Sequence, residues 1–230
     1  MPDAEFDGFA DDYDDQHSAN IKLSGEGPEY FSEYKIADAK AICDRHRAVV
    51  SKILDFGSGI GNSIPWLRKY FSEAEVTCAD ISEHSLEKAK ARYPGSERLC
   101  TITGRPLPFE DATFDLVFTA CVFHHIEHSQ HIPWLTELRR VTRPGGLLVI
   151  FEHNPWNPLT VHAVNTCPFD ANARLISSRK LRASIHTAGW RPQETWHRIF
   201  FPRSLKMLRP LERFMRAIPI GAQYCVIGAR

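Results

Sequence analysis

The sequence predicts an α/β protein with a doubly wound, mostly parallel sheet of seven strands. Short apolar runs alternate with segments of helical periodicity, the connections are short, and a glycine-rich turn follows the first run. This alternation is typical of a parallel sheet that helices cover on both faces. The length of 230 residues, with 43% hydrophobic and 24% charged residues, suits one globular domain.

The first predicted strand is Lys52–Phe56, a short apolar run that Gly57 ends, and an amphipathic helix at about Glu29–Val50 precedes it. Ser82 can cap the helix after the second strand. In chain order, the next predicted elements are helix Ile60–Phe71, strand Glu75–Asp80, helix Glu83–Tyr93, strands Arg98–Thr103 and Phe114–Cys121, helix Pro133–Val141, a turn at 143–146 and strand Leu147–His153.

The last third of the chain has a different pattern. A helix at Ser177–Ala188 ends at Gly189, and a strand at Arg191–Phe201 follows. A basic, helix-like stretch at Arg203–Ala217 precedes the final strand, Ala222–Ala229, which we expect to run antiparallel to its neighbours.

The chain is expected to divide into a cover and a core. Residues 1–50 are predicted to form a helical arm over the active site, and residues 51–230 the core. Within the core, Asn154–Ala173 has three prolines and no clear period. This composition predicts a loop-like lid insertion near 154–176.

Charge and cysteine content limit the classes of function. The formal net charge is zero, which argues against a dedicated nucleic-acid binder. The six cysteines form no C-x-x-C pair, so we expect a reducing compartment rather than a disulfide framework or a zinc site. No segment approaches the roughly 20 apolar residues of a membrane helix, and the first residues are acidic, unlike a signal peptide. The sequence therefore predicts a cytoplasmic protein without a transmembrane segment.

The charges are unevenly distributed along the chain. Residues 1–20 carry seven acidic residues and no Lys or Arg, whereas residues 191–216 are mainly basic. The basic end could meet an anionic substrate or carrier, or the acidic arm itself. The alternative is that two solvated faces simply differ in charge.

The glycine-rich turn, Asp55-Phe-Gly57-Ser-Gly59-Ile-Gly61, joins a strand to a helix. Glycines there permit positive φ and let a ligand lie against bare backbone near a helix N-terminus. The dinucleotide fingerprint G-x-G-x-x-G would need glycine at position 62, where Asn62 stands. The carboxylate of Asp55 would repel a pyrophosphate but could receive an ammonium group. The turn therefore favours S-adenosylmethionine over a dinucleotide.

Asp80 ends the second predicted strand, 25 residues after Asp55. A carboxylate there can accept hydrogen bonds from both hydroxyls of a ribose bound at the glycine turn. The alternative is a role as a helix or turn cap, although Ser82 already offers a cap at this position.

Five segments in order resemble the class I S-adenosylmethionine-dependent methyltransferases, especially the small-molecule branch with a ubiquinone/menaquinone-methyltransferase-like core. They cover roughly residues 50–153. The segments are Ile53–Gly61, Cys78-Ala-Asp80, the stretch from Leu107 to Phe118, Phe123-His-His-Ile126, and the stretch from Leu138 to Leu148. The resemblance implies a Rossmann-like methyltransferase fold.

The resemblance also implies which residues bind the cofactor. The backbone of Gly57 and Gly59 would lie against S-adenosylmethionine, Asp80 would bind its ribose, and Ile81 would pack on the adenine. Many relatives carry a Gly-Asp-Ala stretch after the third strand, but this chain has Thr103-Gly-Arg-Pro106. Thr103 or a backbone carbonyl must then meet the adenine edge. The predicted cofactor-binding set is Tyr13, Asp55, Gly57, Gly59, Gly61, Asp80, Ile81, Thr103 and Ala120.

Catalytic candidates follow the fourth and fifth predicted strands, because open α/β sheets bind ligands at the carboxyl ends of their strands. Methyl transfer from a sulfonium is an in-line displacement that needs alignment and an unprotonated nucleophile. Hydroxyl acceptors usually also need a base, for which His125 or His153 is the best candidate. The alternative for one histidine of the pair His124–His125 is a local hydrogen bond that fixes the loop.

His124-His-Ile-Glu-His128 also spells H-x-x-E-H, a zinc-peptidase pattern. That pattern needs a helix, on which both histidines share a face. Here it follows a strand directly and precedes a turn-like entry, Ser129–Pro133, to the next helix. We therefore expect no metal.

Aromatic residues near the N-terminus could contribute to the substrate side. The stretch Phe6–Asp14 resembles the arm that closes over cofactor and substrate in such enzymes, with Tyr13 as its functional residue. Tyr30, Phe31 and Tyr34 could line the site or pack in the core at helical spacing.

The sequence thus predicts a methyltransferase that moves a methyl group from S-adenosylmethionine to an oxygen, nitrogen or carbon of a small-molecule acceptor, such as a saccharide or a secondary metabolite, and releases S-adenosylhomocysteine. One alternative is an NAD-dependent oxidoreductase on a similar sheet. The other is a non-catalytic S-adenosylmethionine-binding partner subunit.

Overall fold

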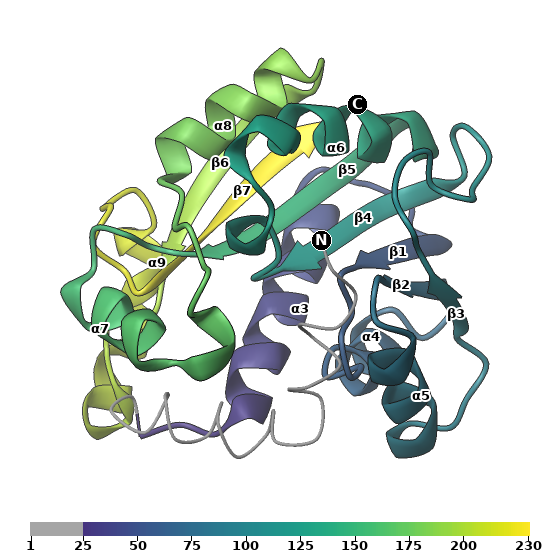
Figure 1. The fold of residues 1–230 in the computed structure, drawn as a ribbon. Coiled ribbons are helices and arrows are strands. Elements are labelled where there is room, and N and C mark those ends of the chain that lie inside the picture. The colour runs from purple at the N-terminus through teal and green to yellow at the C-terminus, as the bar shows by residue number, and fades with distance from the viewer. Residues whose placement is uncertain (1–24) are drawn as a thin grey trace.

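The computed structural model describes residues 25–230, which contain a seven-stranded sheet with the order β3-β2-β1-β4-β5-β7-β6 (Figure 1). β7 runs antiparallel to both of its neighbours, β5 and β6, and the other neighbouring strands pair in parallel. The predicted doubly wound sheet with an antiparallel C-terminal strand is therefore confirmed. The strands are β1 (Lys52–Phe56), β2 (Glu75–Asp80), β3 (Arg98–Thr101), β4 (Phe114–Ala120), β5 (Thr142–His153), β6 (Arg191–Arg198) and β7 (Gln223–Ala229).

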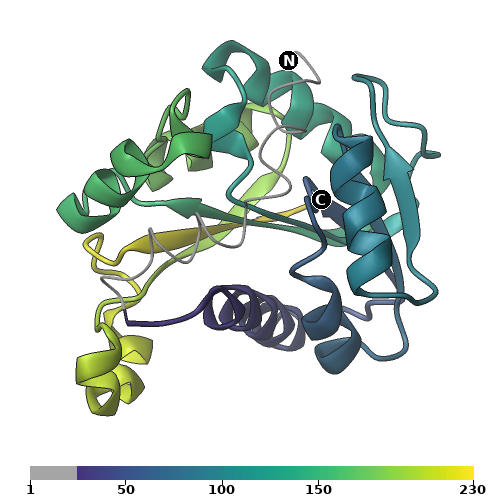
Figure 2. The ribbon, with the colours of Figure 1, turned by 60° about the horizontal axis from the view of Figure 1, so that its bottom comes forward.

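Helices cover both faces of the sheet (Figure 2). One core lies between the sheet and α3, α4 and α5, and the other lies between the sheet and α6 and α8. The helical segments are α3 (Pro28–Arg45), α4 (Ile64–Tyr70), α5 (Glu83–Arg92), α6 (His128–Val141), α7 (Pro158–Thr166), α8 (Ser178–Thr187) and α9 (Glu212–Met215), with 3₁₀ turns η2 (Phe123–His125), η3 (Pro168–Asp170) and η4 (Arg203–Leu211).

Successive strand residues belong to opposite cores, as the period of two requires. Ile53 lies in the core under α3 and Leu54 in the core under α6. Val149 and Leu148 divide in the same way on β5. Both faces of these strands are buried, which explains why they read as continuous apolar runs.

The predicted lid is only partly a loop. Within 154–176 the structure contains helix α7 and the 3₁₀ turn η3, so the prediction of an irregular segment is wrong for this stretch. Asn157 accepts a hydrogen bond from the backbone N–H of Thr160 at 3.0 Å and caps α7. Pro158 stands at the first helical position, where the missing N–H costs nothing. The prolines therefore start helices here instead of breaking them.

Other predicted boundaries also differ from those in the structure. Helix α6 begins at His128, earlier than the expected Pro133, which now lies inside the helix. The buried ring of His131 contacts the carbonyls of Phe123 and Ile126, both at 2.9 Å, and anchors this first turn. The expected turn at 143–146 forms part of β5. The expected basic helix at Arg203–Ala217 is mostly the 3₁₀ turn η4, with Pro210 inside it.

Asp115 joins three strands at the amino-terminal edge of the sheet. Its Oδ2 accepts hydrogen bonds from the backbone N–H groups of Ser51 and Lys52 at 2.6 and 2.8 Å. Its Oδ1 lies 2.6 Å from Nε of Arg143 on β5. Burial raises the pKa of Asp115, but these donors and the Arg143 charge outweigh burial and hold the pKa below its ordinary value. The loops that line the cavity lie at the opposite, carboxyl ends of the strands.

No helix within residues 25–230 is long and apolar enough to cross a membrane.

Candidate active site

A cavity of about 1140 Å³ opens at the carboxyl ends of the parallel strands. The glycine turn after β1, the end of β2 and the loops after β4 and β5 form its floor, while α3 and the segment from α7 to residue 174 contribute its walls. This is the edge at which doubly wound sheets bind ligands. The volume exceeds that of a typical pocket for one small molecule, so two ligands can be held together.

The glycine turn has the backbone that the sequence predicts. Gly57, Gly59 and Gly61 have φ of +74°, +52° and +79°. The N–H groups of Gly57 and Ser58 donate to the carbonyl of Ala79 at 2.8 and 3.2 Å, which ties the turn to β2. A Cβ at Gly57 would lie 2.3 Å from Cγ2 of Val122, so only glycine fits there.

The other two glycines differ in what they face. No atom lies within 4 Å of the place that a Cβ on Gly59 would occupy, and Gly59 lines the cavity. A Cβ on Gly61 would instead meet the side chains of Ile64 and Ala89 at 2.8 and 2.9 Å. Gly61 is not part of the cavity wall, and its lack of a side chain serves the packing of α4 against α5.

Asp80 lies at the end of β2 against the glycine turn. Its Oδ2 accepts from the N–H of Gly59 at 2.7 Å, and its Oδ1 accepts from the N–H of Ser82 at 2.9 Å. Ser82 itself caps α5 by accepting from the N–H of Ser85 at 3.0 Å. The helix therefore has its own cap, and Asp80 lies in the cavity wall with its carboxylate fixed beside Gly59.

Asp55 is buried below the same turn and accepts a hydrogen bond from the hydroxyl of Ser63. The pKa of Asp55 is raised to about 7, mainly by burial and also by the neighbouring charge of Asp80, while the hydrogen bond from the Ser63 hydroxyl partly offsets the rise. An ammonium group beside Asp55 would favour the ionised carboxylate. Asp55 lines the cavity, where such a group could reach it.

The remaining predicted cofactor residues lie around the same end of the cavity. Ile81, Thr103 and Ala120 all line it. Tyr13 lies outside the described residues. Of the three aromatic residues on α3, Phe31 lines the cavity, whereas the hydroxyl of buried Tyr34 donates to Oε1 of Gln223.

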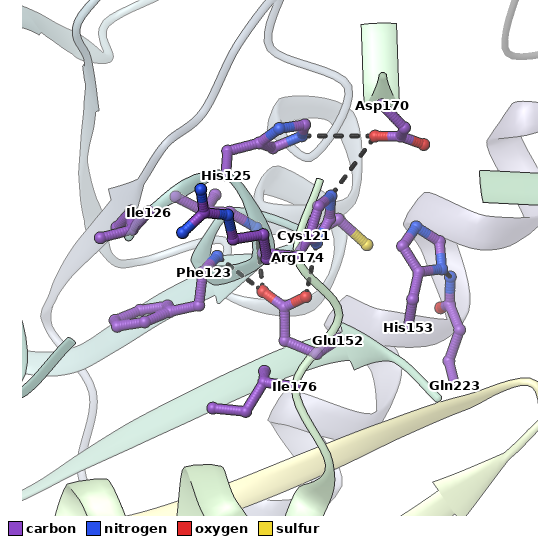
Figure 3. Close-up of polar contacts among 12 residues, drawn as sticks. Cys121, Phe123, His125, Ile126, Glu152, His153, Asp170, Arg174, Ile176 and Gln223 are labelled. Atoms are coloured by element: carbon purple, nitrogen blue, oxygen red, sulfur yellow. Dashed lines mark hydrogen bonds and ion pairs between the residues drawn. The ribbon is translucent and has the colours of Figure 1, made fainter. Parts of the chain in front are cut away.

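The histidine pair after β4 is held by carboxylates from two other segments (Figure 3). Nδ1 of His124 lies 2.6 Å from Oε2 of Glu152, at the end of β5. Nε2 of His124 and Nε2 of His125 each lie 3.4 Å from Oδ1 of Asp170, in η3. Oε1 of Glu152 also accepts from the N–H of Phe123 at 2.7 Å, so this carboxylate fixes the whole loop.

The two histidines have opposite protonation behaviour. Burial lowers the pKa of His124, but Glu152 and Asp170 outweigh burial and raise it to about 10. Burial and the neighbouring His124 charge lower the pKa of His125 to about 4. In the absence of another ligand, His124 is therefore the charged member that fixes the loop, and His125 is neutral.

His153, the other predicted base, ends β5 on the cavity wall. Its Nδ1 lies 3.4 Å from Nε2 of Gln223 on β7, and its ring centroid lies 5.2 Å from that of His124. The predicted bases His125 and His153 thus stand on either side of His124 in one cavity.

Cys121 adds a sulfur atom to the same wall. Lys35 of α3 donates to its Sγ at 3.4 Å, and the residue has a φ of +60°. Burial raises the pKa of Cys121, but the Lys35 charge and His153 outweigh burial and lower it to about 6. Cys121 therefore has the surroundings of a reactive thiol rather than those of an apolar core cysteine.

Asp170 is the site residue that sequence reasoning missed. It lies in the stretch predicted as an irregular lid, more than forty residues from the histidine pair, and no local pattern marks it. A turn of η3 brings it to the pair.

A family model described as a methyltransferase domain matches residues 54–150. Among curated proteins, the chain is 30% identical over 107 residues to a ubiquinone/menaquinone biosynthesis C-methyltransferase of Desulfotalea psychrophila, covering 45% of this chain and 42% of that protein. It is 36% identical over 105 residues to an uncharacterised methyltransferase of Schizosaccharomyces pombe, covering 41% and 37%. The matched segment spans about half, or less, of the length of these relatives.

Solved structures share the fold over nearly the whole chain. A S-adenosylmethionine-dependent methyltransferase from Thermotoga maritima has a TM-score of 0.66 at 18% identity, with 98% of this chain and 97% of that chain covered. One from Aquifex aeolicus has a TM-score of 0.60 at 18% identity, with 92% and 96% covered. At this identity the likeness concerns the fold.

Proposed function

We propose that this chain carries the core of a class I S-adenosylmethionine-dependent methyltransferase, similar to that of the ubiquinone/menaquinone methyltransferases, and that it methylates a small molecule. The observation that carries the proposal is the joining of two sites in one cavity: the turn with Asp55, Gly59 and Asp80, and the histidine cluster after β4 and β5. S-adenosylmethionine would supply a methyl group on a sulfonium for in-line displacement.

The residues of the glycine turn fit the parts of this cofactor. The open space at Gly59 leaves backbone bare for close approach, and the buried carboxylate of Asp55 suits the ammonium group of the methionine portion. Asp80 would exchange its present bond to Gly59 for the ribose hydroxyls. Ile81 and Thr103 would border the adenine, and Ala120 the methionine portion. Gly61 supports this site through packing.

We place the acceptor at the other end of the cavity, between the loops after β4 and β5 and the segment from α7 to residue 174. Polar groups there, from His125, His153 and Asp170, could orient an oxygen or nitrogen nucleophile. His125 and His153 are the candidate bases for a hydroxyl acceptor. A saccharide or another polar metabolite of the cytoplasm would suit these groups.

Binding separates a methyltransferase from an NAD-dependent oxidoreductase. Isothermal titration of the purified chain should show binding of S-adenosylhomocysteine near one equivalent and no binding of NAD. Saturable binding of NAD with none of S-adenosylhomocysteine would contradict the proposal.

Turnover separates an enzyme from a non-catalytic partner subunit. Incubation with S-adenosylmethionine and a panel of hydroxyl, amine and activated-carbon acceptors should release S-adenosylhomocysteine, measured by mass spectrometry. With an acceptor in hand, replacement of the true base should reduce kcat about 10²–10⁴-fold with little change in cofactor affinity, so His125→Ala and His153→Ala are compared. Cofactor binding without product across the panel would favour the partner subunit.

A further inference from the structure

We propose that His124, His125 and Asp170 bind a divalent first-row transition-metal ion, with Zn²⁺ as the best match, at the acceptor end of the cavity. One ligand atom from each residue lies within 4.8 Å of the other two. All three residues line the cavity, and they come from two segments that the fold brings together. The site stands on this geometry, and only the role given to the ion below rests on the proposed function.

The spacing of the ligand atoms is that of a coordination sphere. Nε2 of His124 and Nε2 of His125 each lie 3.4 Å from Oδ1 of Asp170. A tetrahedral ion with bonds of about 2.1 Å keeps its ligand atoms roughly 3.4 Å apart. Direct N–H···O hydrogen bonds are shorter, with a usual length of about 2.9 Å. The carboxylate and the rings are therefore placed as if around a shared centre.

Glu152 occupies the position that an outer partner of a metal-binding histidine takes. Its Oε2 lies 2.6 Å from Nδ1 of His124, the nitrogen that faces away from Asp170. Histidines that bind metals commonly donate their other ring N–H to a carboxylate, which fixes the tautomer and the ring orientation. Glu152 is fully buried, and its second oxygen is held by the N–H of Phe123. Glu152 thus fixes the orientation of the His124 ring and leaves Nε2 directed at Asp170.

Charge in the cluster also favours a divalent cation. The carboxylates of Glu152 and Asp170 are both buried, and within residues 25–230 their ion pairs are with histidine rings alone. A protonated His124 offsets one of these two buried negative charges, and the other remains costly. An ion of charge +2 between the two rings and Asp170 would balance both carboxylates.

Two imidazoles and one carboxylate suit Zn²⁺ and other first-row divalent ions. Three protein ligands leave one tetrahedral position open, as in catalytic rather than structural zinc sites. That position would face the cavity. If the proposed function is correct, it would hold an oxygen of the acceptor and lower the pKa of its hydroxyl, and His153 would remain as the base.

This ligand set differs from the H-x-x-E-H pattern, and it departs from our expectation of no metal. His128, the second histidine of that pattern, is turned to other partners: its Nε2 lies 3.3 Å from the carbonyl of Arg174, and Nζ of Lys180 lies 3.0 Å from its Nδ1. His128 therefore offers a matched control, a nearby histidine outside the ligand set.

The test is metal binding by the 230-residue chain, independent of methyl transfer. The protein is stripped with a chelator and titrated with Co²⁺, whose visible absorption reports coordination geometry, and then with Zn²⁺ as a competitor. We expect one equivalent of Co²⁺ in a four- or five-coordinate site, displaced by Zn²⁺.

Variants locate the ion. His125→Asn and Asp170→Asn should each weaken Co²⁺ binding at least tenfold, and Glu152→Gln about 10–100-fold. His128→Asn should leave the affinity within twofold of the parent. Each variant is first shown to retain its circular dichroism and its binding of S-adenosylhomocysteine. His125→Asn is the most informative, because His125 is partly exposed and its loss disturbs the core least.

Three results would overturn the proposal. They are no Co²⁺ absorption at saturating concentration, equal affinity in the parent and in His125→Asn and Asp170→Asn, and a thiolate-to-cobalt charge-transfer band that places the ion on a cysteine. In the first case, a protonated His124 that lies between Glu152 and Asp170 would take the place of the ion. Loss of metal binding with intact S-adenosylhomocysteine binding would leave the proposed function standing.

Discussion

At the scale of single residues, Gly57 meets two separate requirements: first a backbone φ that favours glycine, and second a lack of space for any side chain. Its φ of +74° lies in the left-handed region, and the space beside it is filled by Val122. Gly59 has a similar φ but open space. The sequence predicts the first requirement from the glycine pattern, whereas the second depends on a residue that arrives from the loop after β4.

We predict that Gly57→Ala lowers the free energy of unfolding by about 2–4 kcal/mol, from backbone strain and from overpacking against Val122. Gly59→Ala should cost only the backbone part, about 1–2 kcal/mol. Urea denaturation of both variants gives the comparison. In a double-mutant cycle, Val122→Ala should offset part of the Gly57→Ala effect. Strictly additive effects would show that Val122 is not the obstacle.

Asp80 and Ser82 can be separated by their effects on binding and on stability. Asp80→Ala should weaken binding of S-adenosylhomocysteine at least tenfold, because about 1.4 kcal/mol is a factor of ten and charge-assisted hydrogen bonds exceed it. Ser82→Ala removes the cap of α5 and should lower the free energy of unfolding by about 1 kcal/mol with unchanged affinity. Titration calorimetry measures the affinities. Unchanged affinity in Asp80→Ala would contradict the ribose assignment.

The candidate site was only partly predictable at this scale. Asp55, Asp80 and the glycines lie in one stretch or at a strand end, so their proximity follows from the parallel sheet. Asp170 reaches the histidines through the path of the segment after α7, which no periodicity records. The altered environment of Cys121 depends on Lys35, which lies on a helix 86 positions away in the chain.

At the scale of elements, the two ends of the parallel strands differ. Side-chain bonds join the strands at their amino ends, and the candidate site lies at their carboxyl ends. Asp115 connects the start of β1 to β4 and, through Arg143, to β5. The carboxyl edge instead ends in loops that face the cavity. Strand and helix identities along this framework were predicted well, because burial on both faces leaves long apolar runs. The lid was not, since short helices begun by proline lack a readable period.

Asp115→Asn should lower the free energy of unfolding at pH 7 by about 1.5–3 kcal/mol, since hydrogen bonds to a charged group are lost. The folded pKa of Asp115 lies below its ordinary value, so its contribution is present above about pH 4 and is lost as the pH falls through the folded pKa. The difference between parent and variant should therefore shrink from about pH 5 towards pH 3.

Urea unfolding at each pH measures this difference. Asp111→Asn, which removes an exposed ion pair with Arg140, is the matched control and should change stability by less than about 1 kcal/mol. A difference for Asp115→Asn that is constant across this range would mean that the carboxylate charge is not the source.

At the scale of the whole molecule, we expect cofactor binding to be coupled to folding. The proposed cofactor would contact the ends of β1, β2 and β4 at once, all of which line the cavity, so unfolding would require its release. At a concentration one hundred times Kd, a ligand adds about 2.7 kcal/mol to the folded state. For a chain of this size that corresponds to a Tm increase of roughly 5–10 °C.

We therefore expect S-adenosylhomocysteine to raise the Tm of the parent by this amount, with a smaller rise for Asp80→Ala at the same concentration. Differential scanning fluorimetry measures both, and NAD serves as the negative control. A Tm that does not move with S-adenosylhomocysteine would contradict the placement of the cofactor.

The position of β7 has a consequence for how the chain is made. It is the last strand of the domain along the chain, yet it lies between β5 and β6 and pairs with both. During synthesis on the ribosome, β6 therefore emerges before the strand that it must pair with exists. Gln223, beside His153, belongs to this same strand. A nascent chain consequently completes the seven-stranded sheet and the Gln223 side of the cavity only after β7 has been made, and a product truncated before β7 would lack both.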